Sequence, residues 1–164
     1  MGTIPRHATV ETVVDAPPTA VWEVVGDPRR TGEWCHECLE VAFVDGATAP
    51  AVGVRFRGRN KVGRNGWSRT CEIVAFEPGR RISWRTIPSR PMYNDSTIWT
   101  ITVEPEGARG TRIVQDYEVV KLGPVMDRFI YTFVKVHRDR RAELTADLAR
   151  IGDVARGPER EMTG

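Results

Sequence analysis

The chain has 164 residues, of which 40% are hydrophobic, and this is enough for one domain with a sizeable apolar core. Its 24 Lys and Arg nearly balance its 22 Asp and Glu, so the net charge of +2 gives no general attraction to nucleic acid. The sequence shows no basic-then-apolar leader and no apolar run near the roughly 20 residues of a membrane-spanning helix. We therefore expect a cytoplasmic monomer or homodimer without integral membrane association and without a nucleic-acid partner.

The three cysteines are too few and too unevenly spaced for a secreted disulfide scaffold, so we expect reduced thiols. Cys35 and Cys38 enclose His36, and thiolates and imidazoles are zinc ligands. Structural zinc takes four ligands, however, and the sequence has no second Cys or His cluster. A redox C-x-x-C would need a strand-to-helix junction in a βαβ setting, which this context lacks. We interpret both cysteines as packing residues and predict no metal and no other cofactor.

After a flexible start over residues 1–6, residues 7–14 are β-branched and roughly alternate in polarity, which predicts a strand. Two prolines end this strand, and Pro18 suits the first turn of a short helix that ends near Gly26. Asp27 and Pro28 then predict the cap and first residue of a second short helix that runs toward Trp34.

Turn residues and alternating polarity predict six more strands, at residues 40–44, 54–62, 67–76, 81–87, 96–104 and 111–120. From residue 125 to about residue 151 no Pro or Gly intervenes, and apolar residues recur at helical intervals. The fold class is therefore α+β, with about seven antiparallel strands in a curved sheet that wraps around a long C-terminal helix. Residues 152–164 are polar and are predicted to be a flexible tail.

One helix cannot fill the concave face of such a sheet, so an internal cavity for a hydrophobic molecule is expected, in the usual size range of ~300–1,000 Å³. Alternation predicts that the sheet contributes one set of lining residues and the helix another. Gln115 and Tyr117 are the polar members of the sheet set and are candidates for orienting a ligand. The predicted lining consists of Trp67, Trp84, Trp99, Ile101, Gln115 and Tyr117 from the sheet, and Met126, Phe129, Ile130 and Phe133 from the helix.

Candidate proton-handling groups are few in this sequence. His137 lies one helical turn beyond Phe133, but it has no visible carboxylate partner, so a packing role is the simpler interpretation. Asp95 does not alternate with the inward residues and is expected to face solvent. Arg55, Arg57 and Arg59 form a basic row that is expected on the solvated outer face, and a protein partner on this row is a weaker alternative.

Several segments resemble the START-like, or SRPBCC, helix-grip superfamily, which includes the birch-pollen allergen and polyketide cyclase/dehydrase-like proteins. These are residues 14–25 (VDAPPTAVWEVV), 26–28 (GDP), 33–34 (EW), 76–84 (FEPGRRISW), 98–101 (IWTI) and 110–113 (GTRI). The resemblance implies a ligand-binding domain over residues 7–151 with an internal hydrophobic pocket. It supports a carrier or sensor of a lipid, polyketide or aromatic metabolite.

The resemblance also offers an enzymatic alternative, a polyketide cyclase or dehydratase of the aromatase type. Such members are thought to use polar pocket groups, among them an arginine, to assist enolisation and loss of water. In this chain the candidates for that chemistry are Tyr117, Gln115, Arg69 and His137. Because one fold hosts carriers, sensors and enzymes, the cavity residues must decide between them.

Overall fold

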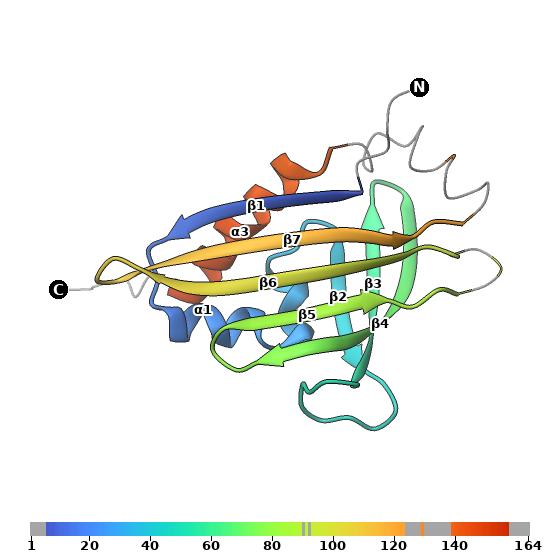
Figure 1. The fold of residues 1–164 in the computed structure, drawn as a ribbon, viewed down its shortest axis with the longest axis horizontal. Coiled ribbons are helices and arrows are strands. Elements are labelled where there is room, and N and C mark those ends of the chain that lie inside the picture. The colour runs from blue at the N-terminus through green and yellow to red at the C-terminus, as the bar shows by residue number, and fades with distance from the viewer. Residues whose placement is uncertain (1–5, 90, 92, 124–128, 130–138, 158–164) are drawn as a thin grey trace.

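A computed structural model describes residues 6–89, 91, 93–123, 129 and 139–157 of the chain. Seven strands form a single antiparallel sheet, and its inner face carries the helices (Figure 1). The strands are β1 (His7–Val14), β2 (Cys38–Phe43), β3 (Arg55–Val62), β4 (Asn65–Glu77), β5 (Arg81–Thr86), β6 (Ser96–Glu106) and β7 (Gly110–Lys121). The helices are α1 (Pro18–Val25), the 3-10 helix η1 (Pro28–Glu33) and α3 (Arg141–Arg156).

The strand order is β1-β7-β6-β5-β4-β3-β2, so β1 and β2 are the two edges, and every neighbouring pair except β1 and β7 is consecutive in sequence. Figure 1 shows β1, β7 and β6 along the long axis of the molecule while β2 and β3 cross it steeply, because the sheet twists strongly. The predicted α+β, helix-grip arrangement is confirmed. Strand ends differ from the predicted ones by no more than two residues.

The two short helices after β1 form where the sequence predicts them. Pro18 and Pro28 each occupy a first helical turn, and the Asp27 carboxylate accepts a hydrogen bond of 3.0 Å from the backbone amide of Arg29. Val21 and Val24 of α1 are fully buried. These two helices therefore close the sheet at one end and leave its inner face to α3 and a cavity.

Helix α3 buries an apolar stripe against α1 and β1, and Leu144, Leu148 and Ile151 have almost no exposed surface. Gly152 allows a close approach to β1, since a Cβ atom added there would lie 2.7 Å from the Cβ of Val14. The helix ends at Arg156, and Gly157 follows with a φ of 72° and a ψ of 178°, a combination that glycine adopts far more readily than other residues.

The predicted uninterrupted helix over 125–151 is wrong in two respects. The backbone at 139–140 is not helical, because Asp139 accepts a hydrogen bond from the amide of Arg141 while the Arg140 side chain binds Glu37. Helix α3 also continues to Arg156, five residues into the predicted tail, since Gly152 packs against β1 and residues 154 and 155 still contact the core. Residues 158–164 of the predicted tail lie outside the described residues.

Among the residues that the structure describes, no helix combines the length and the apolar character needed to cross a membrane.

Candidate functional site

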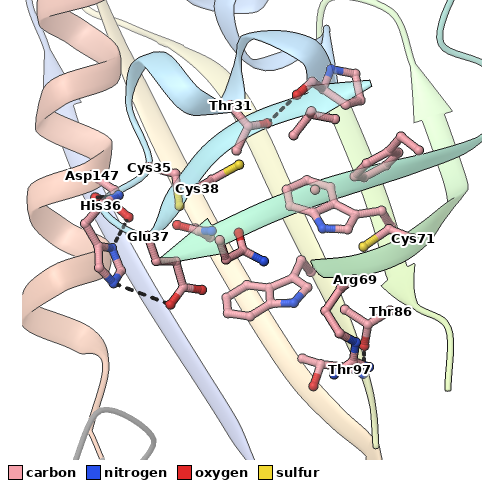
Figure 2. Close-up of a pocket in the computed structure, with 18 of the residues that line it drawn as sticks. Thr31, Cys35, His36, Glu37, Cys38, Arg69, Cys71, Thr86, Thr97 and Asp147 are labelled. Atoms are coloured by element: carbon pink, nitrogen blue, oxygen red, sulfur yellow. Dashed lines mark hydrogen bonds and ion pairs between the residues drawn. The ribbon is translucent and has the colours of Figure 1, made fainter. Parts of the chain in front are cut away.

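A pocket of about 160 Å³ lies between the inner face of the sheet, the η1–β2 segment and α3 (Figure 2). Its walls are mainly aromatic and aliphatic, and Phe56 meets Trp84 edge to face with 6.4 Å between ring centres. Trp99 lines the pocket next to them and packs on Tyr117 at 5.2 Å. The volume is below the predicted ~300–1,000 Å³ and is on the scale of a cavity that holds one aromatic ring.

One polar end of the pocket is an ion pair between Arg69 of β4 and Asp95. The guanidinium Nη1 lies 2.8 Å from the carboxylate, Nη2 donates to the Asp95 carbonyl at 3.1 Å, and both side chains are only 11% exposed. The expectation that Asp95 faces solvent is wrong. The segment before β6 leaves the strict strand alternation, so the carboxylate can turn inward and compensate the buried arginine.

The other polar end joins the segment after η1 to helix α3. His36 Nδ1 lies 2.7 Å from the Asp147 carboxylate, and its backbone amide donates to the same side chain at 3.0 Å. Asp147 is 1% exposed. Glu37 is bound by both carboxylate oxygens to Arg140, at 2.9 and 2.8 Å, and the Arg140 guanidinium lies over the Trp99 ring. Figure 2 shows this group at the helix side of the pocket and Arg69 at the opposite side.

The titratable groups of the pocket are shifted by their surroundings. The hydrogen bond with Asp147 raises the pKa of His36 above its ordinary value. Burial raises the pKa of Cys35 to about 12, that of Cys71 to about 12 and that of Cys38 to about 11. All three thiols therefore stay protonated at neutral pH and are poor nucleophiles in this state.

Four buried polar atoms of the pocket residues have no hydrogen-bond partner among the described residues. They are the Trp34 indole nitrogen, the Nε atoms of Arg69 and Arg140, and Oε1 of Gln115. Buried polar groups without partners are uncommon, and a bound molecule or ordered water is a usual explanation. The four residues that carry these three donors and one acceptor all line the same largely apolar pocket.

The structure brings several predicted site residues together and separates others. Trp67, Arg69, Trp84, Trp99 and Gln115 line the pocket. Ile101 and Tyr117 are buried in the core next to the lining residues, and the pKa of Tyr117 is raised by burial.

The helix side of the predicted lining receives little support from the described residues. Phe129 is 58% exposed. Met126, Ile130, Phe133 and His137 lie outside the described residues, so the roles assigned to them stay predictions.

Sequence reasoning missed the polar groups at both ends of the pocket, namely His36, Glu37, Asp95, Arg140 and Asp147. One signal was available. Asp147 falls between Leu144 and Leu148 within the apolar stripe of α3, and an acidic residue in such a stripe indicates a buried partner. The other four lie outside regular strands and helices, where periodicity gives no direction.

An antiparallel sheet that wraps around a C-terminal helix and encloses a lined pocket defines the helix-grip class of proteins. The profile of the family described as polyketide cyclase / dehydrase and lipid transport matches residues 5–151. The chain belongs to this family. The family includes both hydrophobic-ligand transport and cyclase or dehydrase functions, so membership does not by itself select one of them.

Solved structures with the same fold include two aromatase/cyclases. The aromatase/cyclase Zhui from Streptomyces sp. R1128 superposes with a TM-score of 0.72 at 19% identity, over 97% of this chain and 98% of that one. The di-domain ARO/CYC BexL of the BE-7585A biosynthetic pathway gives 0.69 at 21% identity, over 94% of this chain and 48% of BexL. A protein from Mesorhizobium loti gives 0.62 at 22% identity, over 91% and 98%. At these identities the likeness concerns the fold. No curated protein sequence is significantly similar to this chain.

Proposed function

We propose that the protein binds a small, mainly apolar molecule in the pocket and acts as its carrier or sensor. The observation that carries the proposal is the lining itself, where Phe56, Trp84 and Trp99 face one space of about 160 Å³. Apolar walls with a few convergent polar groups are typical of small-molecule sites. The size favours a ligand of one or two rings, or one end of a longer molecule.

The polar atoms restrict the ligand further. Arg69 and Arg140 already have acidic partners, so the pocket has no unpaired full charge among these groups and does not favour a strongly ionic ligand. The Nε donors of both arginines and the Oε1 acceptor of Gln115 have no partner among the described residues. These groups suit carbonyl and hydroxyl groups on an apolar frame. An oxygen-bearing aromatic or alicyclic compound meets both requirements.

Native mass spectrometry of gently purified protein, followed by titration with one- and two-ring aromatic compounds, tests this proposal. Trp84 and Trp99 line the pocket, so binding should quench the intrinsic tryptophan fluorescence. Trp99→Leu should weaken binding at least tenfold, whereas Arg57→Ala on the exposed face should leave it unchanged. Equal affinity of both variants, or no compound that binds, would reject a pocket function.

A second candidate is a cyclase or dehydratase of the aromatase type, and Arg69 is the observation that favours it. Its buried Nε–H has no partner in the part of the chain that the structure describes, and a donor of this kind can stabilise the oxyanion of an enolising carbonyl. The family description, which names polyketide cyclases and dehydrases, suggests a poly-β-ketone chain as the substrate class, and solved aromatase/cyclases share the fold. The small volume means that only part of such a chain would fit between the described walls.

Turnover separates the two candidates. If the protein is a cyclase, Arg69→Met should lower kcat for a poly-β-ketone substrate by about 10²–10³, the usual effect of losing one oxyanion donor. Arg57→Met is the matched control, because it removes an exposed arginine from the outer face. Equal rates in the two variants, or no turnover above the uncatalysed reaction, would leave the carrier function as the better account.

A further inference from the structure

Three potential metal ligands converge at the helix side of the pocket. The Cys35 thiol, the His36 imidazole and the Asp147 carboxylate each offer one ligand atom, and these atoms lie within 4.8 Å of one another. Cys35 and His36 follow η1, while Asp147 comes from α3, more than a hundred positions later in the chain. The sequence offers no second Cys or His cluster, and only the fold brings the Asp147 carboxylate to Cys35 and His36.

The donor set suits a divalent transition metal, and Zn²⁺ best of all. Thiolate, imidazole and carboxylate are all common zinc ligands, and catalytic zinc takes three protein ligands with a fourth position left open. Cys35, His36 and Asp147 all line the pocket, so a fourth position would face the space where a small molecule binds. Calcium and magnesium prefer oxygen ligands and fit this set poorly.

The surrounding groups are those that a metal site needs. A ligating histidine usually donates its second N–H to a carboxylate, and Glu37 is the carboxylate near His36 Nε2: its Oε2 lies 3.9 Å away, an ion-pair distance that must shorten for a hydrogen bond to form. Glu37 is fixed in turn by its two bonds to Arg140. Asp147 Oδ1 accepts hydrogen bonds from the His36 amide at 3.0 Å and from Arg150 at 3.2 Å. Asp147 Oδ2 lies 2.7 Å from His36 Nδ1, so a metal ion bound by these two atoms would take the place of their hydrogen bond.

The charge and proton balance of the site is simple. In the described state a proton links His36 Nδ1 and Asp147. Metal binding at Nδ1 would place the imidazole proton on Nε2, toward Glu37, and would release the thiol proton of Cys35 to solvent. One thiolate and one carboxylate then neutralise the two positive charges of the ion.

We propose that Cys35, His36 and Asp147 bind one divalent transition metal ion, with Zn²⁺ the best match, at the edge of the pocket. The proposal does not depend on the carrier or cyclase function, because the metal would bind to the protein without any pocket ligand. If both are correct, the metal would present an open coordination position to an oxygen atom of the ligand.

Cobalt titration of protein stripped with a chelator tests the site. We expect one Co²⁺ per chain, a thiolate-to-cobalt charge-transfer band in the near ultraviolet, and the loss of this band when Zn²⁺ is added. Cys35→Ser should abolish the band, whereas Cys71→Ser, which changes another buried pocket thiol, should retain it. Absence of the band in the unaltered chain, or its persistence in Cys35→Ser, would overturn the proposal.

Two further measurements keep the test independent of folding defects in any one variant. Glu37→Gln leaves all three ligands in place and should weaken Zn²⁺ binding by about 10–100-fold through its contact with His36. X-ray absorption at the zinc edge should show one sulfur and the rest nitrogen or oxygen. Two sulfurs would mean that Cys38 replaces Asp147, and this would contradict the proposed ligand set.

Discussion

The Arg69–Asp95 ion pair holds two opposite charges in a wall of the pocket that is almost closed to water. Each side chain is 11% exposed, and the pair is joined by a bond of 2.8 Å. In such surroundings the pair itself contributes little net stability, but a single unpaired member is costly. The strongest effects on folding are therefore expected from variants that remove only one partner.

Arg69→Met should lower the free energy of unfolding by roughly 3 kcal/mol, because the Asp95 carboxylate would remain buried without its partner. Arg69→Met/Asp95→Leu should recover a large part of this loss. Urea denaturation of both single variants and the double variant measures the coupling, with Arg57→Met as an exposed control. Additive losses in the double variant would show that the two side chains do not depend on each other.

The Asp27 carboxylate at the start of η1 is expected to make the free energy of unfolding depend on pH. Its hydrogen bonds with Arg29 lower the pKa of the carboxyl group in the folded protein. The stabilisation is therefore present above the unfolded-state pKa of about 4 and is lost as the pH falls through the folded-state value. Asp27→Asn keeps a good N-cap but has no charge, so its stability should depend less on pH below about 4. The free energy of unfolding is measured by urea denaturation at pH 3.5 and pH 7 for both proteins. An equal change between the two pH values in the parent chain and in Asp27→Asn would contradict this prediction.

At the residue scale, the sequence predicts which side chains face the pocket where the polarity of a strand alternates regularly. Trp84, Trp99 and Gln115 were assigned to the pocket from alternation, and all three line it. His36 and Asp95 lie in connecting segments, where backbone direction depends on tertiary contacts such as the bonds to Asp147 and Arg69. Those contacts join positions far apart in the chain, so local pattern could not reveal them.

Helix α3 and strand β1 depend on a close contact that only glycine permits. A Cβ atom at Gly152 would lie 2.7 Å from both Cβ and Cγ1 of Val14, which is well inside normal contact distance. Alanine is a better helix former than glycine by roughly 1 kcal/mol. Packing against β1 therefore opposes helix propensity at this position.

Gly152→Ala should destabilise the protein by about 1–3 kcal/mol in spite of its higher helix propensity, because the helix must move away from β1. Val14→Ala removes the opposing methyl groups, so Gly152→Ala/Val14→Ala should be more stable than the sum of the two single losses predicts. Thermal or urea unfolding of the four proteins gives the coupling. A Gly152→Ala variant that is more stable than the parent chain would contradict the described contact.

At the element scale, strands and short helices were predictable because turn residues, prolines and the Asp27 cap mark their ends locally. The interruption of the C-terminal helix before Arg141 was not predictable from the sequence. No Pro or Gly marks residues 139–140, and the helical period continues through them in the sequence. The break coincides with the bonds from Arg140 to Glu37, a residue that lies more than a hundred positions earlier in the chain.

Across the whole molecule, the pocket brings together the inner face of the sheet, the segment after η1 and helix α3 (Figures 1 and 2). The sheet was expected from the order of strands, and the resemblance to the helix-grip superfamily predicted a cavity. Its size and its two charged ends depend on how α3 and η1 are placed, which is information that only the folded chain contains. The proposed function therefore depends on the pocket inside the fold.

Gly58 of β3 offers the most direct test of that space. It lines the pocket, and among the described residues a Cβ atom there would meet only Val41, at an ordinary contact distance of 3.8 Å. Gly58→Val should fill part of the cavity without strain and keep or raise the free energy of unfolding, since valine favours strands. Gly66→Val in β4 is the control outside the lining.

Calorimetric titration of these two variants and the parent chain with a two-ring aromatic ligand that the parent binds gives the decisive comparison. The account predicts that Gly58→Val loses at least tenfold in affinity while Gly66→Val binds as the parent does. Undiminished binding by a folded Gly58→Val protein would place the ligand elsewhere and contradict the pocket as the functional site.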